Sequence, residues 1–280
     1  MATLLLDIGG TYVKYNYIDN RFNKVGAFPV KDINGVENIP EAIEKFIHNY
    51  ELDQIGISAP APFDYTNGIG HMEHKLLSLN NFSLRDFFLK RYPKAKIVFI
   101  HDAVAFMLGA LEEFPQLKNK KAACVMLGTG LGYAFSDQGK IWVNDSETSM
   151  PELGFSKYKD GIVEDYVSAT ALLNIAKKEG YNFRYVKEMS DAALKDSKIK
   201  DIFYRVGVTL GEVLNARSKI DLFNVVVIGG GVSRAWDLLK DGFKSVSSLK
   251  CLIVKSSLDC PIIGVKQALK LGKDNIYLKK

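Results

Sequence analysis

Three short glycine-rich turns follow apolar segments of this chain, and each could hold a phosphate group. Glycine permits positive φ and lets backbone N–H groups approach an anion without a Cβ in the way. A neighbouring threonine hydroxyl adds a neutral donor for a phosphate oxygen. A tight hairpin that needs glycine for its geometry alone is the alternative for any one of them. The turns are Gly9-Gly10-Thr11, Gly128-Thr129-Gly130 and Gly229-Gly230-Gly231.

Known phosphate-binding motifs fit these turns poorly. The chain has no GxxxxGK[ST] sequence, which excludes a P-loop NTPase. Gly229-x-Gly231 resembles the start of a dinucleotide fingerprint, but Arg234 occupies the position of its third glycine. The next predicted strand ends in Lys255, where a ribose-binding acid is expected. A Rossmann dehydrogenase is therefore disfavoured.

Four acidic residues are placed where they could do chemistry. Asp7 ends the first apolar strand, and Asp102 follows another strand directly and opens a helix. From the pattern alone Asp102 is a helix N-cap and Asp7 a turn acid. Glu152 and Glu164 lie in the second half of the chain, and from the pattern alone they are surface acids. Glu164 also suits the first turn of a helix.

Alternating strand and helix patterns around these residues predict an α/β fold. Apolar or alternating runs predict strands at residues 3–7, 12–18, 54–58, 96–100, 122–127, 133–136, 225–228 and 251–254. Helical spacing predicts helices at residues 39–50, 84–92, 102–114, 163–179, 198–219, 234–243 and 262–271, with Ser83 capping the second.

The order of elements begins again near residue 121. Both halves open with an apolar strand, a glycine turn carrying a threonine, and an alternating strand. A polar segment at residues 115–121 separates the two copies. We therefore predict an N-terminal α/β domain at residues 1–117, completed by the C-terminal helix in 262–280, and a second α/β domain at residues 118–261.

Composition limits the classes of function. The hydrophobic and charged shares, 47% and 25%, are typical of a soluble globular protein, and no apolar run is long enough to cross a bilayer. The opening segment lacks the basic leader of a secretion signal. Three cysteines without CxxC spacing suit a reducing cytoplasm. The net charge of +5 is scattered, so we expect no nucleic-acid partner and no membrane partner.

Six segments, taken in order, resemble the blocks of the ROK (repressor, open reading frame, kinase) family of sugar kinases. They are LLLDIGGTYVKY, IVFIHDAVAFMLGAL, VMLGTGLGYAF, PELGF, IVEDYVSATAL and NVVVIGGGVSRA. The resemblance implies a two-domain actin/hexokinase-like (ribonuclease H-like) fold, with ATP and sugar bound in the cleft between the domains. A homodimer is compatible with it.

The resemblance also assigns roles to single residues. It implies that Asp102 is the catalytic base and that Glu152 and Glu164 bind sugar hydroxyls. It implies that Asp7 holds Mg²⁺ through water. His101, where the family usually has Asn, is expected in the substrate site. The residues implied to bind ATP are Asp7, Gly9, Gly10, Thr11, Gly128, Thr129 and Gly130 at the phosphates, with Gly229, Gly230 and Gly231 under the adenosine.

Several positions depart from the family pattern. Phe155 stands where the family has a histidine that binds zinc and sugar, and the cysteine-rich zinc loop that should follow is missing. A phenylalanine can fill the space of a missing metal, so no zinc is expected. Lys75 lies where the family often has another sugar-contacting Asn. Because these contacts differ, glucose and an amino sugar remain equally open as substrates.

The resulting hypothesis is ATP- and Mg²⁺-dependent phosphorylation of a sugar hydroxyl. The alternative is a sugar-sensing ROK protein with weak catalysis. Since the chain starts at its first strand, we expect no helix-turn-helix and hence no DNA-binding version. A kinase for a small carboxylic acid is a third reading, but it would not need the pair Glu152 and Glu164.

Overall fold

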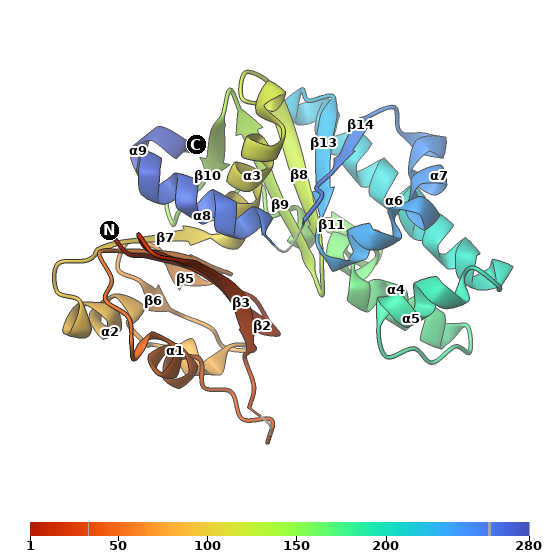
Figure 1. Ribbon diagram of the computed structural model, residues 1–280. Coiled ribbons are helices and arrows are strands. Elements are labelled where there is room, and N and C mark those ends of the chain that lie inside the picture. The colour runs from red at the N-terminus through yellow and green to blue at the C-terminus, as the bar shows by residue number, and fades with distance from the viewer. Residues whose placement is uncertain (33, 257–258, 280) are drawn as a thin grey trace. The chain divides into compact units, whose positions relative to one another are not determined.

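A computed structural model describes residues 1–32, 34–256 and 259–279, and it confirms the α/β fold (Figure 1). The described residues form two compact units. Unit 1 contains Met1–Glu113, Lys140–Ser149 and Leu258–Lys280. Unit 2 contains Phe114–Gly139 and Met150–Ser257.

A five-stranded sheet forms the centre of unit 1, in the order β3-β2-β1-β4-β7. β1 to β3 form an antiparallel meander, whereas β4 runs parallel to β1 and β7 parallel to β4. β1 lies mid-sheet, and five of its six residues are buried. The strands are β1 (Thr3–Ile8), β2 (Tyr12–Ile18), β3 (Asn23–Pro29), β4 (Gln54–Ala59) and β7 (Lys96–His101).

The register of this sheet brings three strand ends together. Asp7 of β1 pairs with Ser58 of β4 on one side and with Lys14 of β2 on the other. Ala59 of β4 pairs in turn with His101 of β7. Parallel strands end at the same edge of a sheet, so the polar residues that follow their apolar cores gather there.

Helices cover the two faces of the unit 1 sheet. Leu4, Leu6 and Ile8 point into the core that includes residues of α1 (Ile39–Ile47) and α2 (Leu84–Arg91). On the other face, Gly56 of β4 lies against α8: a Cβ there would be 2.5 Å from Val265. α8 (Cys260–Leu271) packs beside α3 (Asp102–Glu113), and α9 (Lys273–Ile276) follows it.

Unit 2 repeats the arrangement of four of these strands. β9 is antiparallel to β8, β13 is parallel to β8, and β14 is parallel to β13. Long helices α6 and α7 lie side by side (Figure 1) and approach closely at Gly207, where a Cβ would be 2.1 Å from the Leu239 oxygen. The elements are β8 (Lys121–Leu127), β9 (Leu131–Asp137), β13 (Val225–Gly229), β14 (Lys250–Ile253), α4 (Ala169–Lys178), α5 (Val186–Ala192), α6 (Ser197–Asp221) and α7 (Trp236–Val246).

Short elements complete each unit. In unit 1, β5 (Phe63–Asp64) pairs with β6 (Ile69–Gly70), and β10 (Lys140–Val143) pairs in parallel with β15 (Tyr277–Lys279). In unit 2, β11 (Lys157–Tyr158) and β12 (Gly161–Ile162) form a hairpin. No helix among the described residues is long and apolar enough to cross a membrane.

One helix start and one segment assignment illustrate where the structure differs from the sequence prediction. The helix predicted at residues 163–179 begins only at Ala169, because the Ser168 side chain accepts a hydrogen bond from the Ala171 N–H and caps it. Residues Val163–Asp165 form a separate 3-10 turn. The segment Lys140–Ser149 lies in unit 1, whereas sequence patterns group it with residues 118–261.

The contact between α3 and α8 generates a stability prediction. A Cβ at Gly264 would lie 1.7 Å from the Ala105 carbonyl oxygen. We expect Gly264→Ala to lower the free energy of unfolding by about 2 kcal/mol, since backbone must move to relieve the overlap. Helix propensity alone predicts a gain of roughly 1 kcal/mol. Denaturant unfolding decides between these two expectations, and Lys266→Ala, at an exposed position on the same helix, is the control. A Gly264→Ala protein that is more stable than the unmodified protein would contradict the close contact between α3 and α8.

Candidate functional site

Asp7 is a buried carboxylate with a partner on each oxygen. It is 5% exposed. Its Oδ2 lies 2.8 Å from the Lys14 ammonium, and its Oδ1 accepts a 2.8 Å hydrogen bond from the Ser58 hydroxyl. Burial of a charge is tolerated only with such pairing. None of the sequence motifs identifies Ser58, although a polar residue at the end of a predicted strand is a signal for it.

The first glycine turn leaves backbone N–H groups open. The turn is closed by a 3.0 Å bond from the Gly9 N–H to the Tyr12 oxygen, and the Thr11 oxygen accepts from Val30. Within the described part of the chain, the N–H groups of Gly10 and Thr11 donate to no backbone acceptor. A Cβ at Gly10 would meet nothing within 4 Å. The turn therefore presents donors and open space to an anion.

Asp102 opens α3 directly after β7. Its Oδ1 accepts a 2.6 Å hydrogen bond from the Ala103 N–H and lies 3.3 Å from the His101 Nε2. Desolvation raises the pKa of the Asp102 carboxyl, and the negative charge of Asp7 adds to the rise; His101 and Lys75 oppose it. The side chain is still 32% exposed. A reachable carboxylate with a raised pKa suits a proton acceptor.

His101 is the immediate neighbour of that carboxylate. Its Nδ1 accepts a 3.4 Å hydrogen bond from the Ser149 N–H, so the proton of a neutral ring is assigned to Nε2, which faces Asp102. Tyr65 contacts the ring edge-on. Ser149 ends a loop that Glu147 ties to Lys273 by an ion pair. His101 thus lies where it can hold Asp102 in place.

The second turn, in unit 2, has the same open N–H groups as the first. The Gly128 N–H bonds to the Gly130 oxygen at 3.0 Å and closes it. The Ala169 N–H and the Thr170 hydroxyl then satisfy the Gly128 and Thr129 oxygens, both at 2.8 Å. Among the described residues, the N–H groups of Thr129 and Gly130 have no backbone acceptor.

The third turn lies beside the second. Gly229, which ends β13, pairs with Met126 near the end of β8. Gly230 has φ of +85°, and a Cβ there would lie 2.4 Å from the Leu127 oxygen, so only glycine fits. A Cβ at Gly231 would meet nothing within 4 Å. Two glycine turns thus meet at one end of the unit 2 sheet, and bare backbone lies beside the second turn.

Glu164 contacts the second turn directly. Its Oε2 accepts a 2.7 Å hydrogen bond from the Leu131 N–H, the residue that follows the turn. A Cβ at Gly130 would lie 2.2 Å from the same oxygen. The family resemblance implies that Glu164 binds the sugar, and it does not indicate a contact with a phosphate turn. The structure adds that link.

Glu152 and Phe155 flank a 3-10 turn near Glu164. Glu152 is exposed, and the turn Leu153–Phe155 follows it. A Cβ at Gly154 would lie 2.7 Å from the Leu131 oxygen, so this segment packs at the same strand end as Glu164. Phe155 is 68% exposed. The expectation that Phe155 fills the space of a missing metal is therefore wrong, because its ring is not buried.

A hairpin occupies the segment after Phe155, where the sequence lacks the cysteine-rich loop of the family pattern. β11 and β12 reverse at Lys159, and the Val163 N–H donates to the Ser156 oxygen across the hairpin base. The Tyr158 hydroxyl donates to Glu212 of α6 at 2.7 Å, and its ring meets Tyr166 edge-on. Burial and the bond to Glu212 raise the pKa of Tyr158 to about 12, so the hydroxyl stays a donor.

Oxygen ligands for a cation are sparse. Among the described residues, no group of three His, Cys, Asp or Glu side chains could hold a metal ion. Mg²⁺ does not require such a cage, because it keeps several waters and is held by one or two carboxylates and substrate phosphates. Asp7 fits this mode of binding, although Lys14 already neutralises one of its oxygens.

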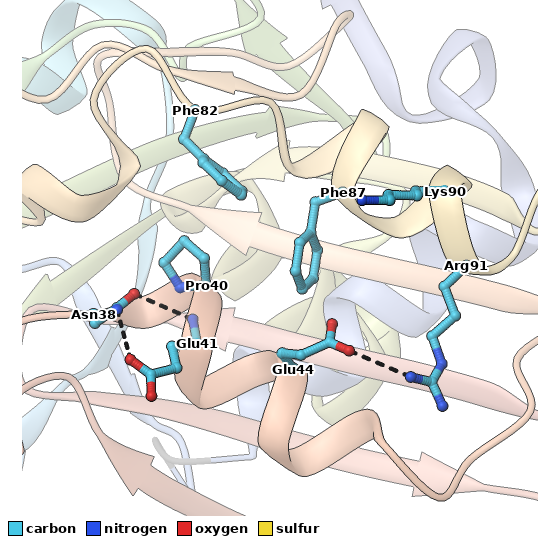
Figure 2. A pocket seen from close by; sticks show the side chains of 8 residues that line it. All are labelled: Asn38, Pro40, Glu41, Glu44, Phe82, Phe87, Lys90 and Arg91. Carbon is cyan, nitrogen blue, oxygen red and sulfur yellow. Dashed lines mark hydrogen bonds and ion pairs between the residues drawn. The ribbon is translucent and has the colours of Figure 1, made fainter.

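A separate groove lies between α1 and α2 in unit 1 (Figure 2). Its floor is apolar and includes Pro40, Phe82 and Phe87. Glu44 at its rim is paired with Arg91 at 3.3 Å. None of the predicted site residues lines this groove. The candidate functional residues of unit 1 are therefore those at the strand ends and the first glycine turn, and those of unit 2 are described by themselves at the second and third turns.

The chain belongs to the ROK family, whose family model matches residues 3–252. A curated relative, a glucokinase from Halalkalibacterium halodurans, is 28% identical over 273 residues and covers 84% of this chain and 81% of its own.

Solved structures share the fold. A ROK family glucokinase from Streptomyces griseus, in complex with glucose and AMPPNP, has a TM-score of 0.76 at 19% identity, covering 97% of this chain and 100% of its own. A ROK family transcriptional regulator, a homologue of the E. coli MLC protein, has a TM-score of 0.73 at 17% identity, covering 96% and 78%. These likenesses confirm the actin/hexokinase-like fold.

The environment of Asp102 generates a titration prediction. Its pKa should lie above the ordinary value of 3.8, because burial and Asp7 disfavour the charged form. The carboxylate is then lost as pH falls through this raised pKa. Carbon-detected NMR of the carboxyl group, assigned by its absence in Asp102→Asn, measures it. Replacing His101 by Phe should raise the pKa further; a value at or below 3.8 in the unmodified protein would contradict the site geometry.

Proposed function

We propose that this protein is a kinase that transfers the γ-phosphoryl group of ATP to a hydroxyl group of a sugar. The observation that carries the proposal is Asp102, a reachable carboxylate with a raised pKa beside His101. It lies in the same unit as Asp7 and the first glycine turn. Membership of the ROK family and the glucokinase relative support the reaction class.

Phosphoryl transfer requires little covalent chemistry from the protein itself. The sugar oxygen bonds to the γ-phosphorus, the bond to the β-phosphate oxygen breaks, and ADP leaves. Asp102 accepts the hydroxyl proton, a role typically worth ~10²–10⁴-fold in rate. The two threonine-bearing turns bind phosphate oxygens through N–H groups that the fold leaves open. The turn at Gly229–Gly231 leaves room for the adenosine.

Mg²⁺ supplies charge neutralisation on the phosphates when it is bound. Asp7 is the residue we assign to it, through water. The Lys14 ammonium lies on Asp7 Oδ2, so it keeps this buried carboxylate compensated in the absence of the cation. His101 keeps Asp102 oriented towards the substrate.

Two glutamates are assigned to the sugar. Glu152 is exposed, and Glu164 has one oxygen engaged by Leu131, which leaves its second oxygen for a hydroxyl group. Carboxylates suit polyols because each oxygen accepts O–H bonds. Glucose and an amino sugar both satisfy this pair of acceptors.

Asp102→Asn tests the chemistry. The amide cannot accept the proton, so we expect turnover to fall by at least ~100-fold. ATP affinity should stay nearly unchanged, because Asp102 lies outside the glycine turns. Steady-state ADP release and calorimetry measure the two quantities. Retention of more than about a tenth of the activity would reduce Asp102 to a helix cap, and sugar binding without any turnover in the unmodified protein would favour the sensing alternative.

We also propose that the protein works without zinc. The hairpin β11–β12 is held by Tyr158 and Tyr166 rather than by cysteine ligands. Elemental analysis of purified protein should therefore find far less than one zinc per chain. Activity should return in full when Mg²⁺ is restored after treatment with a strong chelator. A stoichiometric zinc content would refute this part of the proposal.

A further inference from the structure

Residues that follow the second glycine turn by some forty positions in the sequence form hydrogen bonds with its backbone. The Thr170 hydroxyl donates to the Thr129 oxygen, and the Ala169 N–H donates to the Gly128 oxygen, each at 2.8 Å. Glu164 accepts the Leu131 N–H at 2.7 Å. We infer that Glu164 and Thr170 are positioning residues that aim the N–H groups of this turn at the phosphates of ATP. The inference rests on the proposed kinase function.

Peptide geometry connects these bonds to the anion. In a trans peptide the C=O and N–H groups point in opposite directions from one rigid plane. The peptide that joins Thr129 to Gly130 has its oxygen fixed by Thr170, so the Gly130 N–H must point away from α4. The preceding peptide has its oxygen fixed by Ala169, which sets the Thr129 N–H in the same way. These are the two N–H groups without a backbone acceptor among the described residues.

Glu164 fixes the end of the turn. It holds the Leu131 N–H, and its Oε2 touches the position that a Gly130 side chain would occupy. A larger residue at 130 would push the carboxylate and the turn apart. Because Glu164 is also assigned to the sugar, one side chain then supports nucleotide and sugar. Glu152 has no such contact with the turn, so the two acids are not equivalent.

Substitutions at Thr170 distinguish a positioning role of the hydroxyl from a packing role of the side chain. Its side chain is exposed, so Thr170→Val removes the hydroxyl without opening a cavity. The freed Thr129 oxygen allows its peptide plane to rotate, and the affinity for ATP should fall roughly 2- to 10-fold. Thr170→Ser restores the donor and should recover affinity. Thr66→Val, at an exposed threonine of a unit 1 turn, is the matched control and should change nothing.

The measurement is calorimetric binding of a non-hydrolysable ATP analogue with Mg²⁺, in the absence of sugar. Thermal unfolding of each variant checks that its fold is kept. A Thr170→Val protein with normal thermal stability and normal affinity for the analogue would overturn the inference. So would a loss of affinity that Thr170→Ser fails to recover.

Variants of Glu164 and Glu152 provide a second test of the inference. Glu164→Gln keeps an oxygen that can accept the Leu131 N–H, so affinity for the analogue should stay within about twofold. Glu164→Ala loses that acceptor, and affinity should fall at least threefold. Glu152→Gln and Glu164→Gln should both weaken sugar binding, whereas neither should weaken binding of the analogue. If Glu164→Ala and Glu164→Gln bound the analogue with equal affinity, the proposed positioning role of Glu164 at the turn would be contradicted.

Failure of the proposed function is recognised separately. If the unmodified protein binds the analogue but phosphorylates no sugar, the kinase proposal fails, while the Thr170 series still decides whether the turn is braced. If the unmodified protein does not bind the analogue at all, both proposals are wrong. An effect of Thr170→Val on sugar binding alone would also contradict the inference, because the hydroxyl donates to the Thr129 oxygen of the turn.

Discussion

The structure depends on how the backbone N–H and C=O groups find hydrogen-bond partners where a strand ends in a glycine turn. Each turn closes on itself with one bond, Gly9 to Tyr12 in unit 1 and Gly128 to Gly130 in unit 2. The Thr11 and Gly128 oxygens accept hydrogen bonds from the N–H groups of Val30 and Ala169. The N–H groups left over face no protein acceptor among the described backbone bonds. Leaving such donors open is unfavourable in a dry interior and useful only where an anion or water can reach them.

The carboxylates of unit 1 show how one sheet gives two acids different properties. Sheet register places Ser58 and Lys14 on either side of Asp7, and each contacts one oxygen of its carboxylate. Asp102 has one backbone donor and His101, and desolvation raises its pKa. A fixed charge and a proton acceptor are what phosphoryl transfer needs from two carboxylates. The position of each acid relative to the end of its strand decides whether it serves as the fixed charge or as the proton acceptor.

Local patterns predicted the framework well. The bounds of β2 and the first residue of α3, Asp102, agree with the prediction, because period-two alternation and a strand followed by an acid are local signals. β3 was missed, since its residues are almost all exposed and carry no apolar alternation. The start of α4 was placed too early although Ser168 is a readable cap. Contacts such as Ser58 to Asp7 depend on strand register, which no local pattern specifies.

The contact of Glu164 with the turn gives a physical reason for the form of the hairpin before it. Glu164 must sit within hydrogen-bond distance of Leu131, so the chain entering it cannot be loose. In the family this entry follows a zinc loop. Here Tyr158 bonds to α6 and packs on Tyr166, and both flank Glu164 in the sequence. An aromatic pair worth about 0.5–1.5 kcal/mol beyond its burial and a hydrogen bond to a charged group both stabilise this short hairpin. The proposed zinc-free hairpin is therefore compatible with the position of Glu164, because the segment before Glu164 is fixed by these contacts.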